Sequence, residues 1–446
     1  MTRTRRLGIG LAAVLLILGV NSPARSVEIR PLRWTTDNGM TVLLLERHSL
    51  PIVSLQLLVR AGSARDPEER AGVANMVAQL LDEGTATRSS KQIAEEADFI
   101  GAHLTTSASD DYSTAALDVL KKDLETGVEL VTDVLRHPSF PDEEIERKRS
   151  QIIGQILSEK DNPGNVAEKA FNEMIFGQHP YHSPTEGTEA TVPRITRADL
   201  VTFYEEYYRP NNAILAIVGD ITPGEARTLL ARRFRDWEPR AVPPLVAPPP
   251  PRAETRRSRV IDRNLTQANI ILGQTGIERG NPDYYAVTVM NYILGGGGFS
   301  SRLLKQVRER QGLAYSIYSH FDAGVYPGSF SIVLQTRNSA AAQAIDQIMA
   351  EIQRIRREPV AEQELREAKA YLVGSFPLRI DTNSKAAALL TQIEFHALGL
   401  EYLQDYPAKI RAVSLDDVAR VAKKYLDPEH MTLVMVAHEK EAQVRF

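Results

Sequence analysis

Histidine and cysteine, two residue types that commonly bind catalytic zinc, are few or absent in this chain. It contains nine histidines and no cysteine among its 446 residues. Two histidines four residues apart on a helix face the same side and can share one zinc ion, but no pair here has that spacing. Only His179 and His182 lie close together, in the Pro-rich segment QHPYHSP. We interpret this pair as two loop histidines rather than a new metal site, and we expect no metal in this chain.

A second group of residues is suited to stabilising negative charge. The segment LGGGGFSSRLLKQVRERQGLAYSIYSHF, residues 294–321, places Arg308 seven residues before Tyr315. A guanidinium presents a fixed fork of donors to a carbonyl or an oxyanion, and a phenol donates one hydrogen bond to developing charge. The alternative is a solvated arginine at a helix end and a half-buried strand tyrosine. Because no Gly-Lys-Ser/Thr follows the glycines, we do not interpret them as a phosphate-binding loop.

The elements that position these residues follow from the apolar pattern. The glycine run predicts a hinge that leads into a helix over 300–310, with Gly312 as the helix stop and Tyr315 entering a strand. The N-terminal half mixes period-two segments with longer helical ones. We expect strands over 40–47 and 52–62, a strand pair over 103–120, and helices over 71–82, 89–100, 122–136 and 142–160. Strands beside long helices indicate an α+β fold.

Two parts of the chain resemble each other. Residues 195–220 align with 413–438: each has a capping Ser or Thr, an amphipathic helix that ends in Tyr, a Pro, and an apolar strand. Residues 141–156 parallel 360–375 at nearly the same offset. A constant offset between separated motifs indicates a duplication.

The Pro-rich stretch EPRAVPPLVAPPPPRAETRR, residues 238–257, separates the two copies and has no apolar period. It predicts a semi-rigid linker. We therefore expect an N-terminal half over 27–237 and a C-terminal half over 258–446.

The first 26 residues are typical of a secretory signal peptide: three arginines, an apolar run over Leu7–Val20, and then small residues. The run is too short to span a bilayer comfortably, although an uncleaved anchor is the alternative. We expect no membrane span after signal removal, and a periplasmic protein if the host is Gram-negative. A net charge of −4 gives no electrostatic case for binding nucleic acid.

The segment AGSARDPEERAGVANMVAQLLDEGT, residues 61–85, resembles the helix on which zinc peptidases of the insulinase and pitrilysin type, the inverzincins, carry H-x-x-E-H. In that motif the histidines bind zinc and the glutamate takes a proton from zinc-bound water. Gly72 stands before the motif position, and Gly84 and Thr85 follow it. The sequence is identified as a member of this family from about residue 30 onward.

The chemical residues of the motif are missing. Asn75 and Gln79 occupy the histidine positions, and Ala78 occupies the glutamate position. The family's third zinc ligand, a glutamate on a later helix, corresponds to Gln155, and an acidic position upstream of it becomes Lys148. Neutral amides are weak zinc ligands, and alanine cannot accept a proton. The resemblance therefore implies a degenerate member without the zinc site.

The resemblance also implies a fold and the residues that contact the substrate. It implies two homologous half-domains, each a mostly antiparallel sheet with helices packed on one face, that enclose a cavity. In the family, the residues that Arg308 and Tyr315 resemble reach across this cavity to hold the substrate backbone and stabilise the oxyanion. The strand that resembles residues 103–112 pairs with extended substrate in catalytic relatives, which makes Thr105 and Thr106 candidate substrate-binding residues. An ordinary polar edge strand is the alternative.

Three alternative functions are compatible with these sequence features. The first is a non-catalytic subunit of a heterodimeric zinc peptidase, in which a catalytic H-x-x-E-H homologue holds the zinc and this chain supplies Arg308 and Tyr315 to act on unstructured peptides. The second is a peptide-binding or chaperone-like homologue without activity. The third is an active zinc metalloendopeptidase with unrecognised ligands.

Overall fold

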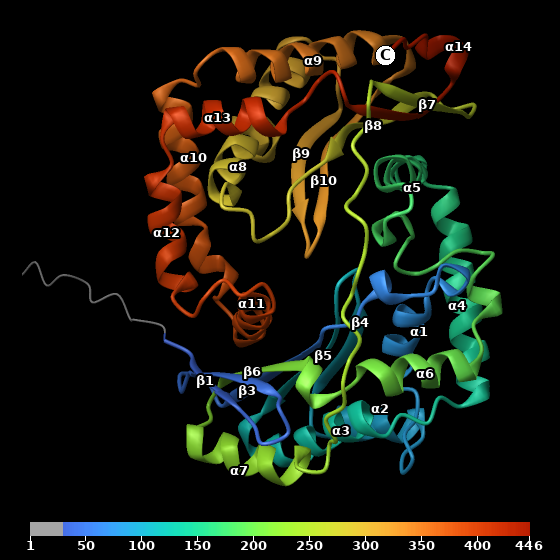
Figure 1. Cartoon of the computed structure of the whole chain (residues 1–446), viewed down its shortest axis with the longest axis vertical. Helices are drawn as coiled ribbons and strands as arrows, with labels where there is room; N and C mark the ends of the chain where they lie inside the picture. Colours follow the sequence, from blue (N-terminus) through green and yellow to red (C-terminus); the bar gives the residue numbers. More distant parts are fainter. Residues whose placement is uncertain (1–29) are drawn as a thin grey trace, which may run out of the picture.

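The computed structural model of the chain describes residues 30–446, and the expected signal peptide over 1–26 lies outside the described residues. Within residues 30–446 the chain forms a six-stranded sheet and a five-stranded sheet, and Figure 1 shows them in two halves that face each other. The expected α+β class is confirmed. No helix in the described part of the chain is long and apolar enough to cross a membrane.

The sheet of the first half has the strand order β1-β2-β6-β3-β5-β4. Its neighbours pair antiparallel except β2 with β6, which are parallel. The strands are β1 Leu32–Thr35, β2 Thr41–Glu46, β3 Ile52–Val59, β4 His103–Ala108, β5 Ser113–Leu120 and β6 Ala213–Gly219.

The sheet of the second half repeats this topology. Its order β7-β11-β8-β10-β9 matches β2-β6-β3-β5-β4, and its parallel pair is again the first, β7 with β11. The predicted homology of the two halves is therefore confirmed at the level of strand order and direction. The strands are β7 Arg257–Asp262, β8 Gln267–Thr275, β9 Ser316–Ala323, β10 Pro327–Arg337 and β11 Thr432–Ala437.

The helices follow the sequence pattern closely. Those of the first half are α1 Val73–Leu80, α2 Ser90–Phe99, α3 Leu124–Arg136, α4 Asp142–Lys160, α5 Pro163–Phe176, α6 Arg197–Tyr207 and α7 Pro223–Phe234. Those of the second half are α8 Tyr284–Asn291, α9 Ala341–Arg357, α10 Glu362–Gly374, α11 Asn383–Phe395, α12 Tyr402–Ala412, α13 Leu415–Tyr425 and α14 Glu439–Ala442. The matching helices α6 and α13 begin with the expected caps, Thr196 and Ser414, each in a capping box.

The helix expected over 300–310 differs from the prediction. A short 3-10 turn covers Gly298–Ser300, and a π-helix covers Leu304–Arg310. The hydroxyls of Ser300 and Ser301 donate to the carbonyls of Gly297 and Gly298, each at 2.7 Å. These bonds hold the tight turn that precedes the helical segment, and the Ser301 oxygen also accepts from the Leu304 N–H at 3.4 Å.

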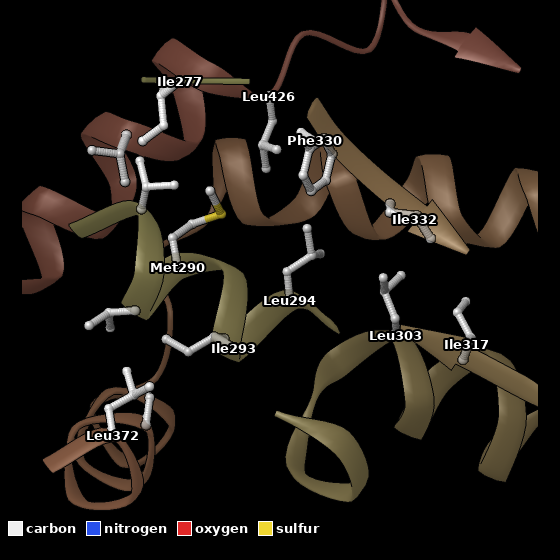
Figure 2. Close-up of a cluster of buried hydrophobic side chains, with 14 of the residues drawn as sticks. Ile277, Met290, Ile293, Leu294, Leu303, Ile317, Phe330, Ile332, Leu372 and Leu426 are labelled. Carbon is white, nitrogen blue, oxygen red and sulfur yellow. The ribbon is translucent and has the colours of Figure 1, made fainter. Parts of the chain in front are cut away.

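The apolar core of the second half lies between its sheet and its helices and continues onto buried residues of the first sheet, such as Leu58 and Ile214. Figure 2 shows Met290 from α8, Ile293 and Leu294 from the π-helix Tyr292–Gly296 that follows it, and Phe330 and Ile332 from β10. All five side chains are buried. Such burial is the main term that stabilises a half of this size.

The two halves also exchange one helix each. In the first half, α5 packs on β8 and β11 of the other sheet, where Phe171 contacts a cluster with Ile271 and Val434. Their neighbours Leu272 and Leu433 belong instead to the core of the second half, so α5 covers the opposite face of that sheet. Reciprocally, α11 packs on β3 and β6 of the first sheet. Figure 1 shows both helices at the junction of the halves.

Candidate functional site

Helix α1, which carries the degenerate zinc positions, is fixed at its start by backbone geometry. Gly72 has φ of 104°, a left-handed conformation that favours glycine. The buried carboxylate of Asp66 accepts hydrogen bonds from the backbone N–H groups of Gly72 at 2.7 Å and Ala74 at 3.0 Å. Burial raises the pKa of Asp66 to about 7, although these backbone donors act in the other direction. Gly72 therefore has a structural role that does not depend on a metal.

We expect this carboxyl to make stability depend on pH. Its pKa in the folded chain lies above its ordinary value of 3.8, so the folded state holds a proton that the unfolded state has lost. The stability of the wild type relative to Asp66→Asn should therefore fall as pH rises from about 4 to about 7, by up to ~1.4 kcal/mol per pH unit, and then level off. Urea unfolding of both proteins across this range measures it. Parallel curves would contradict the assignment.

The degenerate positions form one hydrogen-bonded pair. Asn75 Oδ1 accepts a hydrogen bond from Gln79 Nε2 at 3.0 Å. Asn75 is 8% exposed, and its Nδ2 has no hydrogen-bond partner among the described residues. Ala78, on the same helix face, is 0% exposed. The four-residue spacing thus places the side chains of Asn75 and Gln79 next to each other, as it would place two histidines, but here both groups are amides.

These residues do not fit a zinc ion. Asn75 and Gln79 offer neutral amides, and Ala78 offers a methyl group. Gln155 is exposed on α4 and donates from Nε2 to Glu159 at 2.9 Å. Across residues 30–446 no cluster of three or more His, Cys, Asp or Glu side chains is arranged to hold a metal. The donor chemistry at these positions therefore does not fit the zinc ion of the family's motif.

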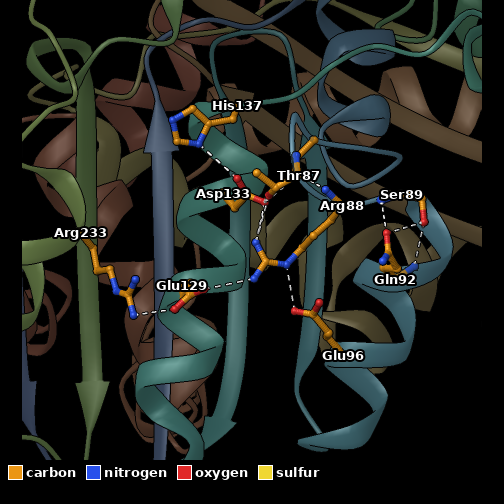
Figure 3. Close-up of polar contacts among 10 residues, drawn as sticks. Thr87, Arg88, Ser89, Gln92, Glu96, Glu129, Asp133, His137 and Arg233 are labelled. Atoms are coloured by element: carbon orange, nitrogen blue, oxygen red, sulfur yellow. Dashed lines mark hydrogen bonds and ion pairs between the residues drawn. The ribbon is translucent and has the colours of Figure 1, made fainter.

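The residues that follow α1 retain a structural network. Thr85 Oγ1 donates to Asp133 at 2.7 Å, and Arg88 donates to the same carboxylate at 2.8 Å. Figure 3 shows Arg88 between Asp133 of α3, Glu129 of α3 and Glu96 of α2. Although burial opposes ionisation, the bonds from Thr85 and Arg88 lower the pKa of the Asp133 carboxyl. Thr85, which follows the motif position, thus has a structural role in the packing of α2 and α3.

Lys148 also has a structural explanation. Its Nζ lies 2.8 Å from Glu83 Oε1, and Arg147 lies 2.5 Å from the other oxygen. Burial opposes ionisation of Glu83, but hydrogen bonds from Lys148 and Ser90 lower its pKa to about 2. These ion pairs tie α4 to the end of α1, so a cation at position 148 supports the helix pair.

A cavity of about 570 Å³ lies between the two halves. Its lining comes from the β4–β5 loop and α5 of the first half and from β8, β9, β10 and α11 of the second. Ionisable lining residues include Asp110, Asp111, Glu168, His320 and Asp322. Burial raises the pKa of Asp110, and a hydrogen bond with Asp322 raises the pKa of His320. Sequence reasoning missed this set, because its members are far apart along the chain.

The tips of two hairpins meet beside this cavity. Asp111, after β4, accepts hydrogen bonds from the Tyr181 hydroxyl at 2.5 Å and from the Val325 N–H at 2.9 Å. The Tyr181 oxygen accepts from the Tyr326 N–H at 3.2 Å, and the Tyr326 hydroxyl donates to the Leu245 carbonyl at 3.2 Å. These bonds join the first half, the β9–β10 turn of the second half and the Pro-rich linker.

The two loop histidines have structural contacts. His179 is 1% exposed, and its Nδ1 accepts from the Tyr181 N–H at 3.2 Å. His182 Nδ1 bonds to the carbonyl of His179 at 2.9 Å. Burial lowers the pKa of His179 to about 4, so this ring is neutral at neutral pH. Both rings are thus part of the loop that supports the hairpin tips.

Arg308 and Tyr315 lie on the second half, at the edge that β9 forms. The guanidinium of Arg308 lies over the ring of Phe299, 5.7 Å from its centroid. Gly312, with φ of 62°, ends the π-helix as expected, and its N–H bonds to the Arg308 carbonyl at 3.0 Å. Tyr315 precedes β9 and is 73% exposed. No hydrogen bond joins Arg308 and Tyr315 within the described chain. The ring of Tyr315 is open to a ligand or a second protein, and Arg308 is half-buried.

Thr105 and Thr106 lie on β4, which ends the strand order of the first sheet. They pair with Ala116 and Ala115 of β5 on one side, and no strand lies beyond them in the part of the chain that the structure describes. Helix α1 packs against β4. The predicted edge strand is therefore present, next to the helix with the degenerate zinc positions.

Comparison with known proteins agrees with this architecture. A family model described as "Insulinase (Peptidase family M16)" matches residues 41–189, and one described as "Peptidase M16 inactive domain" matches residues 194–372. A solved structure from Pseudomonas fluorescens, described as a peptidase M16 inactive domain, superimposes with a TM-score of 0.86 and 30% identity. The match covers 91% of this chain and 98% of that one.

The fold and the helix with its altered motif define a peptidase-like protein with two homologous halves. The chain belongs to peptidase family M16, as the two family models and the Pseudomonas structure show. It is similar to YmxG of Bacillus subtilis, described as an uncharacterized zinc protease, with 26% identity over 354 residues, which is 79% of this chain and 85% of YmxG. A protease from Helicobacter pylori shares the fold, with a TM-score of 0.86 and 21% identity over 92% of this chain and 99% of that one.

Proposed function

We propose that this chain is the non-catalytic subunit of a zinc-dependent peptidase. The catalytic partner is an M16 homologue that carries H-x-x-E-H and the zinc, and the substrates are unstructured peptides. One observation carries the proposal: the motif helix keeps its structural contacts through Gly72 and Thr85, while its chemical positions hold Asn75, Ala78 and Gln79. Several relatives, such as YmxG, are described as zinc proteases, so the reaction of the complex is peptide hydrolysis.

In this function, Arg308 and Tyr315 act on the substrate that the partner cleaves. The guanidinium of Arg308 holds a substrate carbonyl, and the phenol of Tyr315 donates a hydrogen bond to the oxyanion. The 73% exposure of Tyr315 supports this role, because a partner or a substrate can cover the ring. Neither residue needs a metal in this chain.

We further propose that the chain is exported through its N-terminal segment and works in the periplasm of a Gram-negative host. The three arginines followed by a short apolar run support export. Fractionation of the native host, with an antibody to residues 30–446, checks this location.

Co-purification from the native host tests the partnership. We expect the tagged chain to bring down a homologue with an intact H-x-x-E-H motif, and the eluted complex to contain zinc and cleave unstructured peptides. The chain purified alone should contain no stoichiometric zinc. If the isolated chain keeps equimolar zinc after dialysis against chelator and cleaves peptides, it is instead an active peptidase with other ligands.

A peptide-binding homologue without a catalytic partner is the second candidate. The free edge of β4 and the cavity of about 570 Å³ favour it, because an extended peptide can add to an unpaired strand by backbone hydrogen bonds. Recovery of the chain alone or as a homodimer, with bound peptide and no H-x-x-E-H homologue, would favour this function over the first.

A further inference from the structure

Within the described chain, the direction of the Arg308 side chain is set by an aromatic ring. Its guanidinium lies over Phe299, and its Cζ is 5.7 Å from the ring centroid, which is within the distance of a cation–π interaction. The Arg308 side chain makes no hydrogen bond and no ion pair with any residue of 30–446. The direction of this guanidinium therefore depends on the Phe299 ring rather than on a charged partner.

A ring contact leaves the donors of an arginine free. The guanidinium is planar and its N–H groups point outward in that plane, so a ring packed on its face uses none of them. Arg302, on the same segment, shows the opposite arrangement, because its Nε and Nη2 donate to the two carboxylate oxygens of Glu364 at 2.7 and 2.6 Å. Arg302 is therefore committed to the fold, whereas Arg308 still offers a fork of donors to a carbonyl or an oxyanion.

The glycine run explains how Phe299 comes to lie beside Arg308. Gly298 has φ of 54°, a left-handed conformation that favours glycine. A Cβ on Gly297 would lie only 2.6 Å from the carbonyl oxygen of Tyr292, so this position also needs glycine. The tight turn carries Phe299 outward, where it is 72% exposed and is not part of the apolar core. The turn thus presents the ring to the guanidinium, a role for the glycines that requires no phosphate.

We propose that Phe299 is a positioning residue, which holds the guanidinium of Arg308 by its face so that its N–H groups stay directed at the substrate of the peptidase complex. This inference rests on the proposed function and adds to it a residue that acts only through Arg308. A long arginine side chain has many rotamers, and one that is ordered before the substrate arrives loses less conformational entropy on binding. No covalent step is involved.

The first test examines the contact in the isolated mature chain, so it depends neither on the partner nor on activity. Nuclear magnetic resonance of the chain with isotope-labelled arginine reports the Hδ signals of Arg308, which are assigned by their loss in Arg308→Lys. An aromatic ring shifts the signals of protons that lie over its face. Phe299→Leu should therefore move these signals to the positions of a solvated arginine, and Phe299→Tyr, which keeps the ring, should leave them in place.

Phe99→Leu is the matched control for this measurement. Phe99 is 92% exposed at the end of α2, in the other half of the chain, so its loss should leave the Arg308 signals unchanged. Unmoved Arg308 signals in Phe299→Leu would show that the ring does not hold the guanidinium, and the positioning role would be wrong.

The second test is a double-mutant cycle on the reconstituted complex. Phe299→Leu should lower turnover roughly 2- to 5-fold, the factor expected for the loss of a surface cation–π contact, without changing assembly or zinc content. It should have no further effect in the Arg308→Ala background, because the ring then has no guanidinium to hold. Phe299→Tyr should keep the wild-type turnover.

The outcomes of the cycle separate the positioning role from its alternatives. Equal losses in the wild-type and Arg308→Ala backgrounds would make Phe299 a structural residue, and loss of assembly would place its ring in the interface; either result overturns the positioning role. If no H-x-x-E-H partner is recovered, the proposed function fails and the positioning role fails with it. The resonance signals of the isolated chain would then still show whether the ring holds the guanidinium.

Discussion

Arg308→Ala and Tyr315→Phe are each expected to lower the turnover of the reconstituted complex by ~10²–10³-fold, because one lost oxyanion donor typically costs about 3–4 kcal/mol. Assembly and the zinc content of the partner should not change, since both side chains act on substrate. Arg308 contacts only the Phe299 ring among the described aromatic groups, and Tyr315 is exposed, so neither substitution removes a buried contact. Steady-state kinetics on each reconstituted complex provides the measurement.

Nearby cations serve as controls for this experiment. Lys305→Ala and Arg310→Ala change charge in the same segment, and Arg310 bonds only to Gln306, at the surface, at 3.2 Å. Both control complexes should turn over at the wild-type rate. A loss nearer ~10-fold for the Arg308 and Tyr315 variants would indicate substrate positioning rather than charge stabilisation. Wild-type rates for both would make the pair structural, and failure of the complex to assemble would place it in the interface.

Zinc binding should become tight only when Gln155 is changed together with the helix positions. Asn75→His and Gln79→His supply two ligands that the 3.0 Å amide contact already brings together. Adding Gln155→Glu supplies the third ligand and should tighten zinc binding on the order of 100-fold. The free energy of zinc binding to a site with four ligands is roughly 10–16 kcal/mol, which is about 3 kcal/mol for each ligand. Calorimetric titration of zinc into both variants measures this step. Tight binding without Gln155→Glu would show that the third ligand lies elsewhere.

Restoring the base is expected to be the harder change. Ala78 is 0% exposed, so Ala78→Glu forces a carboxylate into a closed position. We expect this substitution to destabilise the chain, while the three ligand substitutions without it bind zinc but cleave nothing. Thermal unfolding with and without Ala78→Glu separates the two effects. Peptide cleavage by the variant that keeps Ala78 would contradict the role assigned to this position.

Local sequence signals predicted the elements well, because each has a short-range cause. The helix over 142–160 has the bounds expected from its period, and α6 and α13 start at their capping residues. The edge position of β4 was also predicted. The π geometry over Leu304–Arg310 was not predicted, because an apolar period does not distinguish a π-helix from an α-helix.

Contacts between residues far apart in the chain could not be predicted from the sequence. Helix α5 was not among the predicted helices, and no local pattern could show that the strands beneath it belong to the other half, where Phe171 meets Ile271. The carboxylates of the cavity were missed for the same reason: Asp111 and Val325 are brought together only by the meeting of two hairpin tips. The roles of Arg308 and Tyr315 remain predictions, since they depend on a second protein.

The exchange of α5 and α11 has a consequence for how such a chain could have arisen. Neither half covers both faces of its own sheet, so a single half on its own would expose the face on which the other half's helix now packs. Two identical copies could cover both faces of each sheet if each copy packed its helix, the equivalent of α5 or α11, on the sheet of the other, as in a domain-swapped dimer. Fusion through the Pro-rich segment would then make the association of the two halves permanent.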